Sequence, residues 1–297
     1  MSVNDKTRTG LLLLDKKPGV TSFAALDEIK KNLGTGKVGH TGTLDKFAGG
    51  LLLVLAGRAV KLAPWFSSCG KEYEGTVRFG VETDTLDPEG EPVFYGEIPS
   101  REEVEKAFSL FRGGILQAPP SYSAIHVGGK RASELARSGN PPEMKKRPVS
   151  VYSLELTFWE PPFAGIRLSC SSGTYVRSLA RDIAIAAGSR AHLAALTRKR
   201  IAGFDLSEAS SPPALVPIDT VVIEKLNLPW FEINSRDVQK IIHGQPPGPI
   251  LDRGTLHAPP GVRDHRSAAI FSAGNPGAFI AMIEKKDGIW KYGYVYC

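Results

Sequence analysis

Residues 39–52 read Gly-His-Thr-Gly-Thr-Leu-Asp-Lys-Phe-Ala-Gly-Gly-Leu-Leu. One acidic residue, Asp45, stands among small, apolar and glycyl residues, and an apolar run to Leu55 follows it. Glycines allow a tight turn and let a ligand approach the backbone closely, and the apolar run is typical of a buried strand. An aspartate in such a turn is more often structural than reactive. The choice between these two roles for Asp45 depends on the remainder of the chain.

The composition is that of a globular protein with a mildly basic surface. The chain has 297 residues, of which 42% are hydrophobic and 23% charged, and its formal net charge is +6. This length fits one large domain, or one large and one small domain. A positive charge favours an anionic partner such as nucleic acid, but it is equally compatible with a role in solubility alone.

Cysteine and histidine spacing argues against metal and disulfide sites. The cysteines Cys69, Cys170 and Cys297 are far apart, and the sequence contains no CxxC, HxxxH or HExxH pattern. This usage predicts a reducing compartment and no metal centre. No apolar run is long enough to span a bilayer, and residues 1–10 lack the apolar core of a secretory signal, so we expect a cytoplasmic protein.

A Gly-rich stretch next to the Asp45 region resembles a cofactor motif only superficially. Residues 34–39 fit G-x-G-x-x-G, but they follow a predicted helix, whereas a dinucleotide site requires a preceding strand. We therefore expect no nucleotide cofactor.

The hydrophobic pattern predicts strand pairs interrupted by helices. Strands are expected at residues 10–14, 51–55, 71–79, 149–159, 165–171 and 191–197, and helices near residues 23–33, 58–66, 100–112, 132–136 and 178–187. In the first helix, Phe23, Leu26, Ile29 and Leu33 share one face, with Thr21 or Ser22 as the N-cap. The absence of regular β-α-β spacing predicts an α+β fold built on a mixed, mostly antiparallel sheet flanked by helices.

A change of texture predicts a second domain. Residues 210–217 are rich in Ser and Pro, and from about Leu228 onward Pro, Gly and short strand patterns dominate. We predict a large domain over residues 1–227 and a small all-β module over residues 228–297.

Separate motifs follow one another along the chain. They are Leu-Leu-Asp-Lys-Lys-Pro-Gly-Val-Thr-Ser (13–22), Gly-His-Thr-Gly-Thr-Leu-Asp (39–45), Lys-Glu-Tyr-Glu (71–74), Thr-Asp-Thr-Leu-Asp (83–87), Pro-Pro-Ser-Tyr-Ser-Ala (119–124), Gly-Lys-Arg (129–131), Gly-Thr-Tyr-Val-Arg-Ser-Leu-Ala-Arg-Asp (173–182) and Leu-Thr-Arg (196–198). In this order, they resemble the motifs of the bacterial TruB-type tRNA pseudouridine synthases, which convert uridine 55 of the T-loop. The tail similarly resembles a PUA domain, an RNA-binding β-module. The resemblance implies a pseudouridine synthase fold with a PUA-like appendage.

The chain departs from the family pattern around the acid. Members commonly read Ala-Leu-Asp-Pro-Leu-Ala-Thr-Gly there, where this chain has Thr-Leu-Asp-Lys-Phe-Ala-Gly-Gly (43–50).

The resemblance also assigns catalytic roles. It makes Asp45 the nucleophile, which attacks either base C6 or sugar C1′. It makes Arg177 the cation that keeps Asp45 ionised and oriented, because a carboxylate in a dry pocket otherwise tends to protonate. Tyr73 would stack on the flipped uracil and help to remove the C5 proton, and Tyr175 and Leu196 would line the base pocket. The isomerisation involves no redox change or group transfer, which agrees with the expectation of no cofactor.

RNA binding is implied for further residues. His40 would push into the T-loop and occupy the space that the extruded base leaves. Lys16 and the basic clusters at residues 145–147 and 198–200 would contact phosphates. The implied partner is the T-stem-loop of tRNA, bound by a monomer that needs no protein partner and no membrane.

Two other functions remain open from the sequence. One is a tRNA-binding or folding protein without catalysis, against which the intact Asp45, Tyr73 and Arg177 argue. The other is a guide-RNA-dependent pseudouridine synthase of the archaeal or eukaryotic type, which shares the motif around the acid.

Overall fold

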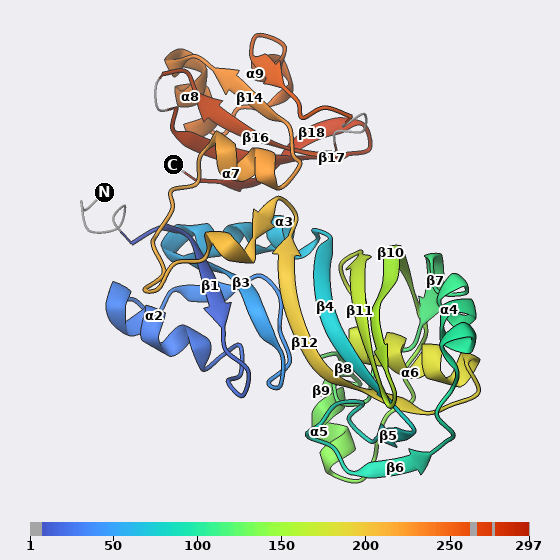
Figure 1. Ribbon diagram of the computed structural model, residues 1–297. Coiled ribbons are helices and arrows are strands. Elements are labelled where there is room, and N and C mark those ends of the chain that lie inside the picture. The colour runs from blue at the N-terminus through green and yellow to red at the C-terminus, as the bar shows by residue number, and fades with distance from the viewer. Residues whose placement is uncertain (1–7, 262–265, 275–276, 297) are drawn as a thin grey trace.

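Two β-sheets organise the protein in its computed structural model, which describes residues 8–261, 266–274 and 277–296 (Figure 1). Within these residues the first sheet has nine strands, of which seven follow the order β1-β3-β12-β4-β11-β10-β7, while β2 pairs with β3 and β13 with β12. Its strands are β1 (Gly10–Lys16), β2 (Val38–His40), β3 (Gly49–Ala56), β4 (Lys71–Phe79), β7 (Gly113–Gln117), β10 (Arg147–Glu160), β11 (Phe163–Cys170), β12 (Ala191–Ile201) and β13 (Phe204–Asp205).

The first sheet is mixed and mostly antiparallel, as the sequence predicted. Strand β3 is buried along its whole length, because it lies between β1 and β12 in a sheet that is covered on both faces. The exception to the antiparallel pattern is the parallel contact of β3 with β12, which places Arg198 beside Gly50. Gly50 has a φ of +102°, and a Cβ there would lie 2.4 Å from the Arg198 carbonyl oxygen. A side chain at this position would therefore separate the two strands.

Helices cover both faces of this sheet. The helices that precede the second sheet along the chain are α2 (Ala25–Leu33), the 3₁₀-helix η1 (Gly57–Leu62), α3 (Ala63–Ser67), α4 (Arg101–Ser109), α5 (Ala132–Arg137), α6 (Val176–Ala186), the 3₁₀-helix η2 (Leu206–Glu208) and α7 (Thr220–Lys225). Helices α4 and α6 share a hydrophobic cluster with β4, β10, β11 and β12, whereas α2 packs on β1 and β3. Helix α4 begins with a capping box, since Ser100 and Glu103 bond to each other's backbone N–H groups.

The prediction for the face of α2 is wrong at one residue. Leu26 and Ile29 are buried as expected, but Phe23 is 68% exposed because the helix begins only at Ala25. The ring of Phe23 instead lies under the amine of Lys30, 4.3 Å from the ring centroid. Cation–π contact of this kind suits an exposed aromatic side chain.

The second sheet lies at one end of the first (Figure 1). Among the described residues it has the order β15-β14-β16-β17-β18, with β14 (Trp230–Ile233), β15 (Thr255–His257), β16 (Ser267–Ser272), β17 (Phe279–Lys286) and β18 (Ile289–Val295). The predicted C-terminal sheet is therefore confirmed. The module is not purely β, because α8 (Ser235–Ile242) and α9 (Gly248–Leu251) pack their apolar residues against it.

The two sheets share one hydrophobic cluster. Leu55 and Phe66 of the first part pack in the same cluster as Phe271 and Met282 of the second, and helix α7 contributes Val222. The division after residue 227 stays a prediction. In the described ranges, no helix is long and apolar enough to cross a membrane.

Two hairpins project from the opposite end of the first sheet. They are formed by β5 (Val81–Thr83) with β6 (Pro92–Tyr95) and by β8 (His126–Val127) with β9 (Lys130–Arg131), and α5 lies beside them (Figure 1). The segments next to these hairpins, residues 85–87 and 122–124, reach the Asp45 region, as described below.

Candidate active site

Asp45 lies in the loop between β2 and β3, and two polar side chains hold this loop in place. The Ser22 hydroxyl accepts from the Leu44 N–H at 2.8 Å and donates to the Leu44 carbonyl at 2.9 Å. The Lys16 amine donates to the carbonyls of Val20, at 2.6 Å, and Lys46. Since both neighbours of Asp45 are bound in this way, the backbone that carries the carboxylate is fixed. Ser22 was expected as a possible helix cap; Thr21 makes the local turn instead, by accepting from Ala24 N–H.

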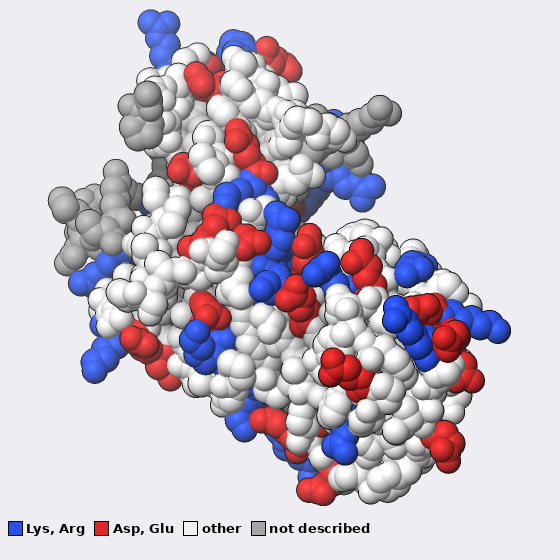
Figure 2. Space-filling view, in the orientation of Figure 1, with Lys and Arg blue, Asp and Glu red and all other residues white. Residues whose placement is uncertain are grey.

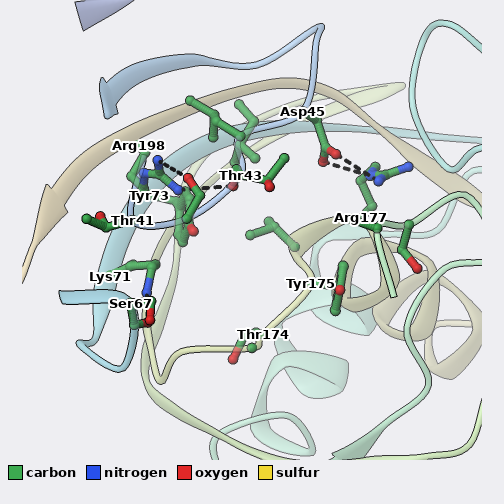
Figure 3. A pocket seen from close by; sticks show the side chains of 17 residues that line it. Thr41, Thr43, Asp45, Ser67, Lys71, Tyr73, Thr174, Tyr175, Arg177 and Arg198 are labelled. Atoms are coloured by element: carbon green, nitrogen blue, oxygen red, sulfur yellow. Dashed lines mark hydrogen bonds and ion pairs between the residues drawn. The ribbon is translucent and has the colours of Figure 1, made fainter. Parts of the chain in front are cut away.

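Arg177 meets Asp45 from the first turn of α6. Its Nε and Nη2 donate to the two carboxylate oxygens of Asp45, each at 2.9 Å (Figure 3). The Arg177 side chain is 5% exposed and that of Asp45 is 34% exposed. A bidentate guanidinium–carboxylate pair fixes the orientation of both groups, and Asp45 keeps the open side that a nucleophile needs.

The remaining donors of Arg177 are also occupied. Nη1 donates to the Thr85 carbonyl at 2.7 Å and to the Asp87 carboxylate at 3.1 Å, and Nη2 donates to the Tyr122 carbonyl at 3.0 Å. All five N–H groups of the guanidinium are therefore used. Burial raises the pKa of Asp87, while its hydrogen bond from Thr85 and the charge of Arg177 oppose that change.

The base-pocket residues expected from the resemblance come together beside this ion pair. Tyr73 on β4 lies opposite Arg198 on β12, and Leu196 is two residues before Arg198 on the same strand. Tyr175 directly precedes α6, where the Gln117 amide accepts from its N–H at 2.8 Å and donates to its carbonyl at 3.1 Å. Burial raises the pKa of Tyr73, and the charge of Arg198 opposes this effect.

These side chains line a cavity of about 260 Å³ (Figure 3). In Figure 3, Asp45 and Arg177 lie at one end, and Lys71, Ser67 and Arg198 lie at the other. The lining residues are Thr41, Gly42, Thr43, Leu44, Asp45, Ser67, Lys71, Tyr73, Ser123, Ala124, Gly173, Thr174, Tyr175, Val176, Arg177, Leu196 and Arg198. A carboxylate at the edge of a partly open pocket whose wall includes Tyr73, Tyr175 and Leu196 suits nucleophilic chemistry on a flat, partly apolar ring.

The expected phosphate contacts of Lys16 and Arg198 do not fit the structure. Lys16 and Arg198 are each 1% exposed. Lys16 donates to the backbone around Asp45, and the Nε of Arg198 donates to the Leu51 carbonyl at 2.8 Å. An amine or guanidinium that is buried and bound to carbonyls is not available to a phosphate in solution.

The other residues of the two basic clusters differ in whether acidic side chains lie beside them. Lys199 and Arg200 are partly exposed and lie within 3.8 and 4.0 Å of Glu74 and Glu72. Lys and Arg are interspersed with Asp and Glu on the face shown in Figure 2. Residues 145–147 are exposed and enter none of the ion pairs within the described chain, so this cluster remains the stronger candidate for phosphate contact.

His40 lies next to the cavity rather than in its wall. It ends β2, opposite Val54 of β3, and its neighbour Thr41 lines the cavity. Its ring Nδ1 is buried without a hydrogen-bond partner in the part of the chain that the structure describes. Burial and the charge of Arg198 lower the pKa of His40, which favours the neutral form of the ring.

Comparison with known proteins shows which family this chain belongs to. Residues 30–176 match the family described as "TruB family pseudouridylate synthase (N terminal domain)". The chain is 41% identical over 220 residues to the tRNA pseudouridine synthase B of Borreliella burgdorferi (strain ZS7), covering 73% of this chain and 78% of that protein. This chain belongs to the TruB family of pseudouridylate synthases.

A relative with longer coverage and a solved structure agree with the TruB assignment. The tRNA pseudouridine synthase B of Chromohalobacter salexigens is 38% identical over 274 residues, which is 88% of each chain. A solved structure entitled "Crystal Structure of a Cbf5-Nop10-Gar1 Complex" superposes with a TM-score of 0.68 at 25% identity and covers 98% of this chain and 86% of that one. Because that superposition covers nearly the whole chain, the likeness includes the second sheet as well as the TruB catalytic part.

Several supporting residues of the TruB site were missed from the sequence. Asp87 stands in a quoted motif and could have been suspected as a second acid, but no role was assigned to it. Ser22 ends a quoted motif but was expected only as a helix cap, and Gln117 lies outside the quoted motifs. Their backbone partners are 22 and 58 positions away, so these contacts leave no local pattern. Lys71 also belongs to a quoted motif, and its place in the cavity wall follows only from the pairing of β4 with β12.

Proposed function

We propose that this chain converts uridine 55 in the T-loop of tRNA to pseudouridine, acting as a monomer without a protein partner or guide RNA. The single observation that carries the proposal is the bidentate pair of Asp45 with Arg177 at the edge of the cavity. The tRNA substrate is supported by relatives 38–44% identical that are named tRNA pseudouridine synthase B. A cytoplasmic location follows from such a substrate.

The chemistry starts at Asp45. Its carboxylate is oriented by Arg177, so one oxygen can attack base C6 or sugar C1′ without first losing rotational freedom. The C1′–N1 bond then breaks with its electron pair going to N1. The uracil turns over, and the C5 electron pair forms the new bond to C1′. The bond between Asp45 and the substrate carbon breaks, and its electron pair returns to the carboxylate. The C5 proton passes to a base, and N1 takes up a proton. Atoms and electrons balance, so no oxidant or cofactor is consumed.

The cavity walls explain how the free base would be retained. Tyr73 offers a ring face for stacking, and Leu196 and Tyr175 close the pocket around it. Enclosure matters because water that reached C1′ would hydrolyse the nucleoside instead of isomerising it. His40, as a neutral ring beside the entrance, would fill the place of the extruded base, and residues 145–147 would contact phosphates.

We also propose that residues 1–227 form the catalytic domain and residues 228–297 a PUA-like domain that adds RNA contacts. The presence of a separate five-stranded sheet after residue 228 supports this division.

The decisive experiment is pseudouridine mapping of an unmodified tRNA transcript after incubation with the purified chain. A single pseudouridine at position 55, formed also on an isolated T-stem-loop, is the expected result. Conversion only after addition of a guide RNA and partner proteins would contradict the proposal and favour the guide-dependent type. Binding without conversion would favour the RNA-folding role.

A further inference from the structure

The cavity wall contains more positive charge than the Asp45–Arg177 pair explains. Its charged lining residues are one carboxylate, Asp45, and three cations, Lys71, Arg177 and Arg198. Arg177 is shared between Asp45 and Asp87. Among the described residues, neither Lys71 nor Arg198 takes part in an ion pair. Lys71 donates to backbone carbonyls, and Arg198 donates to backbone carbonyls and forms a side-chain hydrogen bond with Tyr73.

Both unbalanced cations are buried. Lys71 is 9% exposed, and its amine donates to the carbonyls of Ser67 at 3.1 Å and Cys69 at 2.7 Å. Arg198 is 1% exposed, and besides Leu51 it donates to the carbonyls of Gly42 and Thr43 at 3.3 Å each. Each side chain keeps at least one N–H beyond these bonds. Burying two neighbouring cations without a counter-ion costs stability, which is unusual outside functional sites.

Strand geometry places these cations on the base-holding wall. Side chains two residues apart on a strand share one face, so Lys71 lies beside Tyr73 on β4, and Arg198 lies beside Leu196 on β12. Arg198 is the direct cross-strand partner of Tyr73. The four side chains therefore form one continuous wall, and all of them line the cavity. A base stacked on Tyr73 would have the two cations at its edge.

We propose that Lys71 and Arg198 form a cationic wall that stabilises the negative charge on the uracil base while it is detached from the ribose. When the C1′–N1 bond breaks, the electron pair stays on the base and is shared by N1, O2 and O4. That charge exists only between the breaking of the old bond and the formation of the new one, so fixed cations beside it lower the barrier without tightening binding of the intact RNA. Because both cations are buried, their effect on a neighbouring charge is larger than it would be in bulk water.

The alternative ligand for these cations is an RNA phosphate, which the geometry disfavours. A phosphodiester is part of a continuous strand, and Lys71 and Arg198 are nearly covered by protein, at the end of the cavity away from Asp45 (Figure 3). A detached base can occupy such a place, because it is held only by its own stacking and edge contacts.

The first test compares Lys71→Met, Lys71→Arg and the surface control Lys61→Met in the full chain. Single-turnover formation of pseudouridine should slow about 100-fold in Lys71→Met, since loss of one charge-stabilising donor typically has this effect. Lys71→Arg should keep most of the rate, and Lys61→Met should keep all of it. The Kd for tRNA should stay within about threefold in every variant, since the base anion is absent from the ground state. An unchanged rate in Lys71→Met, or a rise in Kd that matches the loss of rate, would overturn the proposal.

A pH profile provides a readout that a structural role would not affect. Burial, followed by the charge of Arg198, lowers the pKa of Lys71 to about 8. The other groups facing it are Cys69 and Tyr73, whose pKa values burial raises, and Cys170, whose pKa burial raises to about 11. The wild-type rate should therefore fall as the pH rises through about 8, and Lys71→Arg should remove this fall because arginine stays protonated. Identical profiles for wild type and Lys71→Arg would contradict the proposal even if Lys71→Met does not fold.

This inference rests on the proposed function only in requiring that a uridine be isomerised. The rate measurements therefore use the total amount of pseudouridine formed, whatever its position in the RNA. The modified position is determined in a separate mapping experiment. Conversion at a uridine other than 55 would refute the proposed target and leave the test of Lys71 intact.

Discussion

Arg177 donates from Nε and Nη2 to both oxygens of Asp45, each at 2.9 Å, across 132 positions of sequence. The same guanidinium also binds Asp87, the Thr85 carbonyl and the Tyr122 carbonyl. One buried side chain thus joins the Asp45 loop to two segments that adjoin the hairpins at the far end of the sheet. This arrangement explains how a carboxylate on a glycine-rich loop can hold a defined orientation.

Asp45→Asn should abolish conversion and leave RNA binding intact. The amide keeps the shape of the side chain but cannot act as a nucleophile, so we expect a loss of at least about 10³-fold in single-turnover rate. The Kd for unmodified tRNA should remain within about threefold, because the substitution removes no phosphate contact. Asp27→Asn, at an exposed helix position, is the matched control. Measurable turnover in Asp45→Asn would refute the nucleophile assignment.

Arg177→Lys should lower turnover much more than affinity. Lysine keeps the charge but cannot bind Asp45 through two parallel hydrogen bonds, so we expect a rate loss of about 10²-fold. The melting temperature should also fall, since Asp87 would lose part of its buried partner. Arg181→Lys serves as control, because Arg181 lies one turn further along α6 and pairs with Asp182 instead. Equal losses of rate and affinity would indicate that Arg177 is chiefly an RNA contact.

Lys16→Met should affect stability and turnover, whereas Lys146→Met should affect the salt dependence of tRNA binding. Lys16 supports the Asp45 loop, so its loss should lower the melting temperature and the turnover, with no change in the salt dependence of tRNA binding. Lys146 is exposed, so its loss should reduce the slope of log K against log salt concentration by about 1 and leave saturated turnover unchanged. A reduced slope for Lys16→Met would restore the expectation that this amine contacts phosphate.

Gly50→Ala should destabilise the protein strongly. The new Cβ would meet the Arg198 backbone at 2.4 Å, and the φ of +102° is one that alanine rarely adopts. We expect a loss of about 3 kcal/mol or more in the free energy of unfolding, measured by urea denaturation. Gly114→Ala, where a Cβ would meet no atom within 4 Å, should change it by less than about 0.5 kcal/mol. Similar values for the two variants would show that β3 and β12 can separate without cost.

Acidification should destabilise the fold through His192. Burial lowers the pKa of this ring, whose Nδ1 lies 2.9 Å from the Val81 carbonyl oxygen. The folded state therefore favours neutral histidine, and the unfolded state takes up the proton first as the pH falls below about 6.5. The melting temperature should drop between about pH 7 and the lowered pKa, and less steeply in His192→Gln than in wild type. The exposed His126→Gln should leave this slope unchanged; an unchanged slope in His192→Gln would exclude His192 as its source.

Much of the fold could be predicted from the sequence, because its signals are local. The apolar run of β3, the capping box of Ser100 with Glu103 and the alternation along β4 each depend on neighbouring residues. Phe23 was assigned wrongly because helix α2 begins two residues later than predicted. Helices α8 and α9 were missed because they are short, and a few apolar residues fit a helical pattern as well as a strand pattern.

The candidate site could likewise be predicted only in part. The ordered motifs that mark Asp45, Tyr73, Tyr175, Arg177 and Leu196, and the family resemblance that they carry, could be read directly from the sequence. The support of Arg177 by Asp87 became visible only in the folded chain. The same holds for Lys16, Lys71 and Arg198, which donate to buried backbone carbonyls. They could not be predicted because a basic side chain has the same local sequence signal whether it is buried or exposed. Whether its charge meets water or a buried carbonyl depends on how distant loops and strands pack around it.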